Sequence, residues 1–319
     1  MASQALKLRQ NVSSFHSGLG LWGLQDGEYT MTEHVFNVDA YAPAEMAQRV
    51  ATAGVSKGNL DPATMFALAV LAGAFIALGG NVATIALTHN GLGYGVSRLL
   101  GGLAFSLGLI LVIVGGAELF TGNNLIVMAW ASGKLPTSRV LRNWVIVYIG
   151  NFVGALGTAV GVYVSRQWTF DAYHVGATAL TIAHAKVQYD FLSAFALGAF
   201  CNALVCLAVW LCFSARTTTD KIVAIVPPIT AFVAAGFEHS VANMYFIPLG
   251  LWLRDHPHVR EVAGHSLEQL ADLTWRGFFV NNLIPVTLGN LFGGTIMVAA
   301  VYWFVYLRCP PKDRAGPHD

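Results

Sequence analysis

Two stretches of this chain, GAELFTGN at residues 116–123 and GFEHSVAN at residues 236–243, share the pattern G-x-E-x-x-x-x-N. Each stretch interrupts a run of apolar residues that is long enough to cross a lipid bilayer. A glutamate inside such a run is energetically costly, so two glutamates at matching places indicate a function. Paired interruptions of this kind are typical of transport proteins, whose permeation site lies where two inverted halves meet.

The composition predicts a membrane protein. Of the 319 residues, 55% are hydrophobic and only 11% are charged, whereas soluble domains have roughly 25% charged residues. A membrane-spanning helix needs about 20 apolar residues, and joining the uncharged runs across Glu118 and across Glu238-His239 gives six spans. We therefore expect an all-α membrane protein with six transmembrane helices. The uncharged runs are 62–97, 99–117, 119–133, 143–165, 191–215, 222–237, 240–253 and 277–307.

The similarity between the two halves extends beyond the interruptions. Gly73-Ala74-Phe75 in the first span recurs as Gly198-Ala199-Phe200 in the fourth, and the third and sixth spans share N-x6-G-N-x-x-G at 143–154 and 282–293. Three matches in the same order indicate a duplication of three spans. An odd number of spans per copy forces the second copy to be inverted. We expect two inverted three-helix repeats with broken second and fifth helices.

The distribution of Lys and Arg predicts the orientation. With both termini on one side, that side holds twelve Lys and Arg and the other holds six, which places both termini in the cytoplasm. The expected organisation is a cytoplasmic N-terminal arm over 1–41, a transmembrane channel domain over 42–308 and a cytoplasmic tail over 309–319. The channel domain is expected to begin with a short amphipathic helix near 42–55.

The broken helices create polar groups inside the membrane. A helix that stops and restarts leaves unpaired N–H groups and the positive end of a dipole. The hydroxyl of Thr121 adds a further polar group, and the amide of Asn243 can hold its loop because it both donates and accepts hydrogen bonds. Glu118 and Glu238 have two readings: they brace the loops by accepting hydrogen bonds, or they relay protons.

Four glycines flank the breaks, namely Gly115, Gly116, Gly122 and Gly236. Glycine is suited to positions where the chain must leave helical geometry. We expect all four to serve the breaks, and most of the other glycines to serve helix packing.

His239 is the only histidine expected inside a span. A buried histidine can be a hydrogen-bonded core residue, but this one lies at a break, and the inverted symmetry places Thr121 opposite. Imidazole changes its charge near neutral pH, while a small carboxylate has a pKa of about 4 in water and pays several kcal/mol to enter a dry constriction as an anion. The hypothesis is that His239 protonates the carboxylate while Thr121 and Asn202 hold it.

Lys186 and the cysteines have simpler readings. Lys186, at the outer end of the fourth span, is either a snorkelling lysine at the membrane interface or part of a cationic funnel that concentrates anions. Cys201, Cys206 and Cys212 lie within one span without metal-ligand spacing, which indicates packing. We expect no metal and no cofactor.

Other classes of function fit the residues less well. A neutral-solute pore of the aquaporin kind is disfavoured by the lack of an Asn-Pro-Ala pair at the breaks and by His239. An intramembrane enzyme would need a nucleophile–base pair or an H-E-x-x-H motif inside a span. The net charge of +1 does not bear on nucleic-acid binding, and no basic patch in the sequence supports it. The residues favour a channel or transporter for small monovalent anions, not an enzyme.

Several long motifs carry a resemblance to a known family. They are GGLAFSLGLIL at 101–111, ELFT at 118–121, Asn202 with VCLAVW at 205–210, GFEHSVANM at 236–244 and NLIPVTLGN at 282–290. With these motifs the chain resembles, from about Pro43 to Arg308, the formate/nitrite transporter family, and most closely its bacterial formate channels. The MYFIP stretch at 244–248 favours the formate branch, while Thr121-Gly122-Asn123 is similar to nitrite and more general members.

The resemblance implies an aquaporin-like fold and a homopentamer in the bacterial inner membrane, with one pore per subunit. It implies formate as the substrate, with proton-coupled or protonation-assisted passage; nitrite, hydrosulfide, acetate and lactate remain alternatives. The partners are then the anion, protons and membrane lipid. The resemblance also implies a polar centre of Thr121, Asn202 and His239, a vestibule lysine at Lys186, and a hydrophobic constriction formed by Phe105, Leu109, Leu119, Phe120, Val205 and Phe232.

Overall fold

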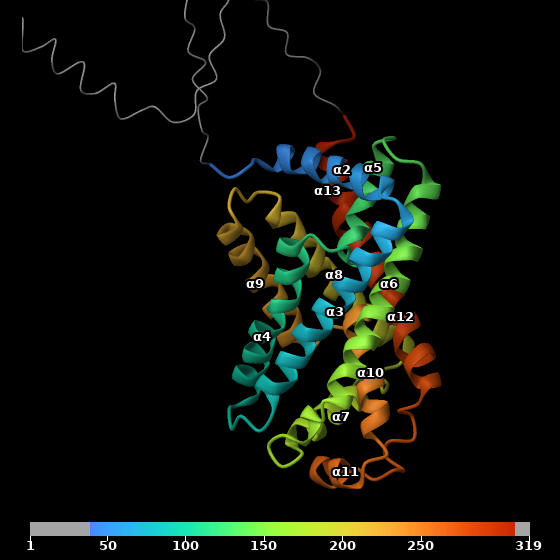
Figure 1. Cartoon of the computed structure of the whole chain (residues 1–319). Helices are drawn as coiled ribbons and strands as arrows, with labels where there is room; N and C mark the ends of the chain where they lie inside the picture. Colours follow the sequence, from blue (N-terminus) through green and yellow to red (C-terminus); the bar gives the residue numbers. More distant parts are fainter. Residues whose placement is uncertain (1–38, 310–319) are drawn as a thin grey trace, which may run out of the picture. The chain divides into compact units, whose positions relative to one another are not determined.

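The structure is a computed structural model that describes residues 39–309 (Figure 1). The expected N-terminal arm and tail lie almost wholly outside these residues. Within 39–309 every regular element is helical, and six helices are long and apolar enough to cross a membrane. The prediction of an all-α protein with six transmembrane helices is confirmed.

The chain order of the elements follows the duplicated pattern. The first half consists of α2 (Pro43–Asn59), α3 (Pro62–Leu87), α4 (Tyr94–Gly115), the 3₁₀ helix η1 (Gly122–Ile126), α5 (Val127–Ala131) and α6 (Thr137–Val164). The second half consists of η2 (Gln167–Thr169), α7 (His174–Lys186), α8 (Phe191–Cys212), α9 (Thr218–Ala235), α10 (Ser240–Leu253), α11 (Pro257–Ala263), η3 (Gly277–Leu283), α12 (Ile284–Phe292), η4 (Gly293–Ala300) and α13 (Val301–Tyr306).

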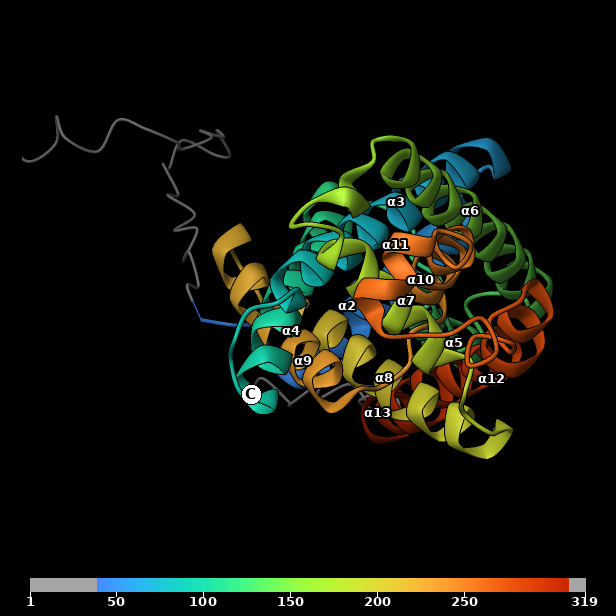
Figure 2. The ribbon, with the colours of Figure 1, turned by 90° about the horizontal axis from the view of Figure 1, so that it is seen from below.

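The spans pack side by side as a closed bundle. Neighbouring pairs are α3 with α4, α4 with α9, α9 with α8, α8 with α12, and α6 with α3, and the Tyr148 hydroxyl of α6 bonds to Thr287 of α12 at 2.7 Å. Figure 2, seen along the spans, shows this outline with α7 and α10 inside it. The short helices α2 and α5 lie at one end of the bundle and α7 and α11 at the other (Figure 1).

The second and fifth spans are broken where the sequence predicts. Helix α4 ends at Gly115 and α9 at Ala235, and the next residues, Gly116 and Gly236, adopt φ angles of 75° and 78°. Glycine adopts this left-handed conformation without the steric penalty of a side chain. Gly115 ends α4 and Gly122 begins η1, so both keep helical backbone, and of the four glycines at the breaks Gly116 and Gly236 take the left-handed conformation.

The first span of each half starts the same way in both copies. Asp61 caps α3 by accepting a hydrogen bond from Thr64 N at 3.0 Å, and Asp190 caps α8 by accepting one from Ser193 N at 3.0 Å. Hydrogen bonds from Thr64 and Ser193 hold the pKa of each capping carboxyl below its usual value. Aspartate stabilises a helix start because it satisfies free N–H groups.

One detail of the predicted repeat is wrong. Asn151 donates to the carbonyl of Ala69 at 2.7 Å, and its counterpart Asn290 donates to the carbonyl of Gly198 at 2.8 Å. Gly198 therefore corresponds to Ala69, and the sequence match of Gly73 with Gly198 is displaced by about one helical turn. The register is set by side-chain hydrogen bonds, which a glycine-based match does not detect.

The sixth span differs from the third in its backbone. Residues Gly277–Tyr306 form one continuous run, but η3 and η4 within it are π-helical. Such wider turns often accompany functional sites. Here η3 holds Asn282 and η4 holds Gly294, both of which contact the breaks described below.

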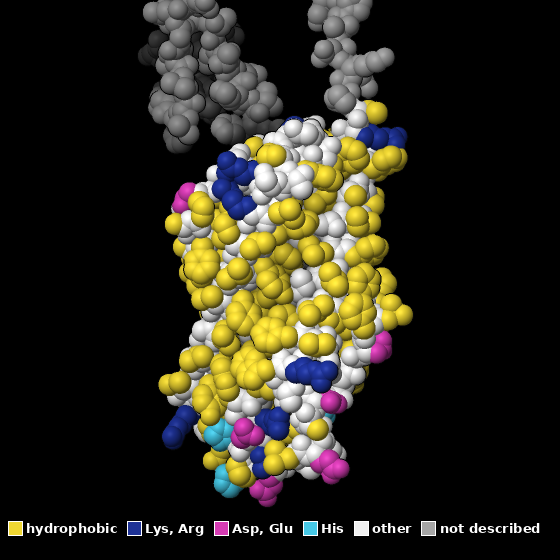
Figure 3. Space-filling view, turned by 90° about the vertical axis from the view of Figure 1, so that its right-hand side faces the viewer, with side chains coloured by type: hydrophobic (Ala, Val, Ile, Leu, Met, Phe, Trp, Pro, Cys, Tyr) yellow, Lys and Arg dark blue, Asp and Glu magenta, His cyan; other side chains and the backbone are white. Residues whose placement is uncertain are grey.

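The outer surface matches a membrane environment. Figure 3 shows a broad apolar band between two ends that carry the charged side chains. Exposed residues such as Val145 and Ile149 on α6 and Leu288 on α12 contribute to the apolar surface. Apolar surface of this extent is typical of a protein in contact with lipid or a partner, and the chain is a multi-pass membrane protein. Helix α2 ends four residues beyond the expected boundary near 55 and buries Met46 and Val50.

Candidate functional site

Two cavities of similar size open toward opposite ends of the bundle. The α7-side cavity has a volume of about 280 Å³, and the α2-side cavity about 270 Å³. The side chains used below that line the α7-side cavity are Arg98, Phe105, Lys186, Phe232, Glu238 and His239. Those that line the α2-side cavity are Arg49, Lys57, Leu109, Leu119, Asn123 and Lys221.

Buried apolar side chains separate the two cavities. Phe105 and Phe232 close the α7-side cavity with an edge-to-face contact of 5.5 Å between ring centroids. Leu109 and Leu119 line the α2-side cavity, and Val205 is buried. Five of the six expected constriction residues therefore line a cavity or are buried.

Phe120 lies elsewhere. Its ring packs edge-on against Tyr148 at 4.8 Å and faces an apolar groove between α6 and α12. Its backbone N–H donates to Asn151 Oδ1 at 2.9 Å, which draws this residue toward α6. Phe120 lines neither cavity, contrary to the expectation that it forms part of the constriction.

Thr121 and His239 meet between the cavities. Thr121 Oγ1 lies 3.0 Å from His239 Nε2, and both residues are buried. His239 also caps α10, because its Nδ1 accepts a hydrogen bond from Ala242 N at 3.0 Å. An accepting Nδ1 carries no proton, so the proton of the neutral ring is on Nε2. The ring therefore donates to Thr121, and the hydroxyl proton of Thr121 is free to donate to a ligand.

The cap at α10 also restricts the charge of His239. A doubly protonated imidazole donates from both nitrogens, and its Nδ1–H would face the Ala242 N–H. The capping hydrogen bond thus favours the neutral ring in this conformation. Protonation of His239 would require the ring to leave the cap.

Asn202 has a structural role in this conformation. Its amide donates to Asn124 Oδ1 at 3.0 Å and to the Asn290 carbonyl at 2.7 Å. Both donors are used, so the expectation that Asn202 holds an anion through hydrogen bonds is wrong for this state. Asn202 instead connects η1 at the first break with α12, whose Asn290 bonds to the second break. The sequence reasoning missed Asn124, whose only signal is its place directly after the motif asparagine.

Glu238 braces the second break. Its carboxylate accepts hydrogen bonds from Lys186 Nζ at 2.8 Å, from Asn243 Nδ2 at 2.7 Å and from Asn282 Nδ2 at 3.1 Å. Asn282 also donates to the Lys186 carbonyl at 2.7 Å. These contacts satisfy a buried charge, as burial requires.

The first break repeats this arrangement. Glu118 accepts hydrogen bonds from Lys57 Nζ at 2.5 Å and from Asn123 Nδ2 at 2.6 Å. Asn143, the counterpart of Asn282, accepts from Asn123 at 3.0 Å and donates to the Lys57 carbonyl at 3.3 Å. Of the two readings of the glutamates, these contacts support the bracing one. The sequence had placed Lys57 only among the twelve Lys and Arg of the expected cytoplasmic side.

Two more asparagines hold the backbone of the breaks. Asn290 Oδ1 accepts from Ser240 N at 2.9 Å, and its amide donates to the Glu238 carbonyl at 2.9 Å. Asn151 likewise accepts from Phe120 N and donates to the Glu118 carbonyl, each at 2.9 Å. Non-helical backbone at membrane depth needs such internal partners.

The cationic side chains around the α7-side cavity are engaged. The Lys186 side chain is only 15% exposed and forms an ion pair with Glu238, so the snorkelling reading is wrong. Arg98 donates to the carbonyls of Val233 and Ala234 at the end of α9. Basic side chains stabilise a helix C-terminus because they complement its dipole. The α7-side cavity therefore holds one carboxylate and two neighbouring cations.

Comparison with known proteins assigns the family. The sequence profile of the formate/nitrite transporter family matches residues 44–304. The chain belongs to this family. It is 42% identical to the formate channel FocA of Escherichia coli strain K12 over 273 residues, which cover 85% of this chain and 96% of that channel. It is 38% identical to a probable formate transporter of Methanothermobacter thermautotrophicus over 284 residues, which cover 84% and 97% of the two chains.

Solved structures of the formate/nitrite transporter family share the fold. A pentameric formate channel with formate bound is 44% identical, with a TM-score of 0.72, covering 77% of this chain and 98% of that one. An ion channel of the same family is 28% identical, with a TM-score of 0.70, covering 82% and 98%. The relatives are channels and transporters, so the prediction that this chain is not an enzyme is confirmed.

Proposed function

We propose that this chain is a formate channel in which the anion passes between the two cavities at the Thr121–His239 pair. The names of the relatives support formate as the substrate. The observation that carries the proposal is the buried hydrogen bond between Thr121 and His239, which leaves one hydroxyl proton free at the junction. Nitrite, hydrosulfide, acetate and lactate remain the alternative substrates, because a small pocket discriminates weakly between small solutes.

The apolar side chains at the junction set the energetic problem. Phe105 and Phe232 on one side and Leu119 on the other exclude water from the path, so a bare anion loses several kcal/mol of solvation there. The free Thr121 hydroxyl offsets part of this loss by donating to the carboxylate. Protonation of formate removes most of the remainder, because formic acid is neutral.

His239 is the proposed source of that proton. The proton has to reach the ring from water in a cavity. Its binding to Nδ1 requires the ring to give up the hydrogen bond from the Ala242 N–H. A proton then passes from Nε2 to the carboxylate oxygen, either directly or through the Thr121 hydroxyl, and leaves a neutral ring with its proton on Nδ1. The ring returns to its cap once it has lost that proton to cavity water and taken one up at Nε2, because the cap needs an unprotonated Nδ1. The proposal links proton transfer to a local change at the start of α10.

Assembly and orientation complete the proposal. An apolar groove of about 650 Å³ between α6 and α12 supports packing against further copies, and a homopentamer follows by analogy with the pentameric relative. The α2-side cavity faces the cytoplasm in the proposed inner-membrane orientation, together with both termini. The excess of Lys and Arg on that side supports this orientation.

Uptake of labelled formate into proteoliposomes, measured at two external pH values, tests the proposal. His239→Asn is the decisive variant, because an asparagine side chain can still cap α10 but does not titrate. We expect His239→Asn to fold and to lose most of the pH dependence of uptake. His239→Phe removes the cap as well and serves as the comparison for loss of structure.

Two results would contradict the proposal. Uptake by His239→Asn with the same pH dependence as the wild type would rule out His239 as the proton source. Uptake of nitrite or lactate that competes with formate on equal terms would rule out formate as the preferred substrate.

A further inference from the structure

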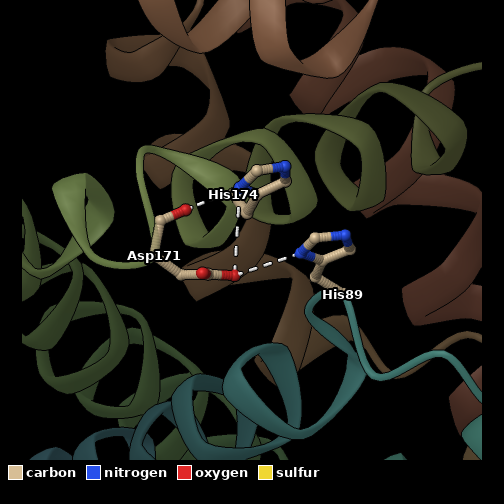
Figure 4. A group of neighbouring side chains, drawn as sticks. All are labelled: His89, Asp171 and His174. Atoms are coloured by element: carbon tan, nitrogen blue, oxygen red, sulfur yellow. Dashed lines mark hydrogen bonds and ion pairs between the residues drawn. The ribbon is translucent and has the colours of Figure 1, made fainter.

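Three side chains that can bind a metal meet at the end of the bundle that holds α7. His89 lies in the loop between α3 and α4, Asp171 lies in the loop before α7, and His174 is the first residue of α7. Figure 4 shows both imidazole rings turned toward the same oxygen of the Asp171 carboxylate. One ligand atom from each residue lies within 4.8 Å of the other two.

The separations fit a shared ion better than direct hydrogen bonds. His89 Nδ1 lies 3.5 Å and His174 Nδ1 lies 3.8 Å from Asp171 Oδ2. Hydrogen bonds between such atoms are about 2.7–3.2 Å long. In a tetrahedral zinc site with bonds of about 2.0–2.1 Å, neighbouring ligand atoms are roughly 3.3 Å apart. Each nitrogen is a few tenths of an ångström farther than that from Asp171 Oδ2, and the two nitrogens lie within 4.8 Å of each other.

The two rings are stacked face to face. Their centroids are 4.3 Å apart, and the rings are within 9° of parallel. An imidazole nitrogen binds a metal in the plane of its own ring, so two parallel rings share one ion only after at least one of them turns. Neutral imidazole is the form that binds metals.

The proton of His174 has an evident place in the metal-free state. His174 Nδ1 lies 2.6 Å from the Asp171 carbonyl oxygen, so Nδ1–H donates to that oxygen. Binding of a metal at Nδ1 requires the ring to carry its proton on Nε2 instead. This is a change of tautomer through exchange with water, with no net release of a proton from the neutral ring.

The cluster is open to ions from solution. The side chains of His89, Asp171 and His174 are 66%, 55% and 37% exposed. His89 and Asp171 adopt φ angles of 43° and 50°, a left-handed conformation that is uncommon for residues other than glycine. These tight turns bring the tips of two loops, which are distant in the sequence, to one point.

We propose that His89, Asp171 and His174 form a binding site for a transition-metal dication, for which Zn²⁺ is the test ion. Two imidazoles and one carboxylate, with water in the remaining position, are a ligand set that Zn²⁺ accepts. The ion would fasten the α3–α4 loop to the start of α7. The two helices next to the site, α3 and α7, also line the α7-side cavity, α3 through Leu87 and α7 through Thr181. The site is independent of the transported anion.

Zinc titration of the full-length protein, purified without a histidine tag and held in lipid nanodiscs, tests the site by calorimetry. We expect one ion per protomer in the wild type. The double variant His89→Ala/His174→Ala and the variant Asp171→Asn should bind Zn²⁺ at least about tenfold more weakly, since loss of site residues commonly weakens metal binding by that factor. His258→Ala is the matched control, because its side chain is 73% exposed at the same end of the bundle.

A second measurement identifies the ligands. X-ray absorption of the zinc-loaded wild type should show nitrogen and oxygen ligands at about 2.0–2.1 Å, including two imidazoles. Zinc should also raise the melting temperature of the wild type and of His258→Ala but not of the double variant. Equal zinc affinity in the wild type and the double variant would overturn the proposal, and so would the lack of any zinc binding by the wild type.

Discussion

Leu119 and His239 occupy equivalent positions in the two halves of the chain, each directly after the glutamate of its G-x-E motif. Leu119 lines the α2-side cavity and His239 the α7-side cavity. The counterpart of Thr121 in the second half is Val241, so the hydrogen bond between Thr121 and His239 joins one polar residue from each half. The symmetric scaffold therefore holds a single asymmetric polar centre.

Thr121→Val tests the free hydroxyl. The substitution keeps the shape of the side chain, and Val241 shows that the repeat accepts valine at this position. It removes the donor to the anion and the acceptor of His239, and loss of such a buried partner costs about 1–3 kcal/mol. We expect formate uptake in proteoliposomes to fall by about tenfold or more. Thr158→Val is the control, because that hydroxyl bonds only to the Gly154 carbonyl within α6; equal uptake by the two variants would contradict the role of Thr121.

Glu238→Gln and Glu118→Gln compare the two braces. Lys186 is 15% exposed and Lys57 is 33% exposed, so water can solvate Lys57 better after its partner is lost. Removing one partner of a buried ion pair costs roughly 3 kcal/mol, whereas more exposed pairs contribute about 1 kcal/mol or less. We expect Glu238→Gln to lower the melting temperature in detergent more than Glu118→Gln does. The opposite order would show that exposure of the lysine does not decide the strength of the brace.

The spans and breaks were predictable from the sequence because they depend on local composition. Uncharged runs of about 20 residues identify membrane helices whatever their partners. Gly116 and Gly236 were identifiable because each ends a helix inside such a run. The pairing of His239 with Thr121 followed from the inverted symmetry, which the repeated motifs of the chain indicate.

The side-chain partners were not predictable because they depend on register and rotamer. Whether Lys186 points to the interface or to Glu238 is decided by helix packing, and the composition of the span is the same in both cases. Phe120 was misplaced because its backbone bond to Asn151 turns the ring toward α6. The cluster of His89 with Asp171 was not visible, since the two residues come from different loops and share no motif.

Gly294→Ala tests the link between the two breaks. A Cβ at this position would lie 2.4 Å from Asn202 Nδ2 and 2.7 Å from the Asn124 side chain. Both distances are too short, so the hydrogen bond between Asn202 and Asn124 would have to shift. We expect a melting temperature lowered by several degrees, since disturbing a well-packed interior typically costs about 1–3 kcal/mol. Gly157→Ala is the control, because a Cβ there meets no atom within 4 Å. A Gly294→Ala protein as stable as Gly157→Ala would show that Asn202 can move freely.

Lys221→Gln tests whether the α2-side cavity attracts anions. This cavity is lined by Arg49, Lys57 and Lys221, and its lining within residues 39–309 contains no Asp or Glu. Exposed cations raise the local concentration of an anion only over about one Debye length, which is roughly 10 Å at 0.1 M salt. Formate flux from this side should therefore fall by about twofold at low ionic strength in Lys221→Gln and remain near the wild-type value at high salt. An equal loss at both salt concentrations would indicate a contact role for Lys221 instead of electrostatic attraction.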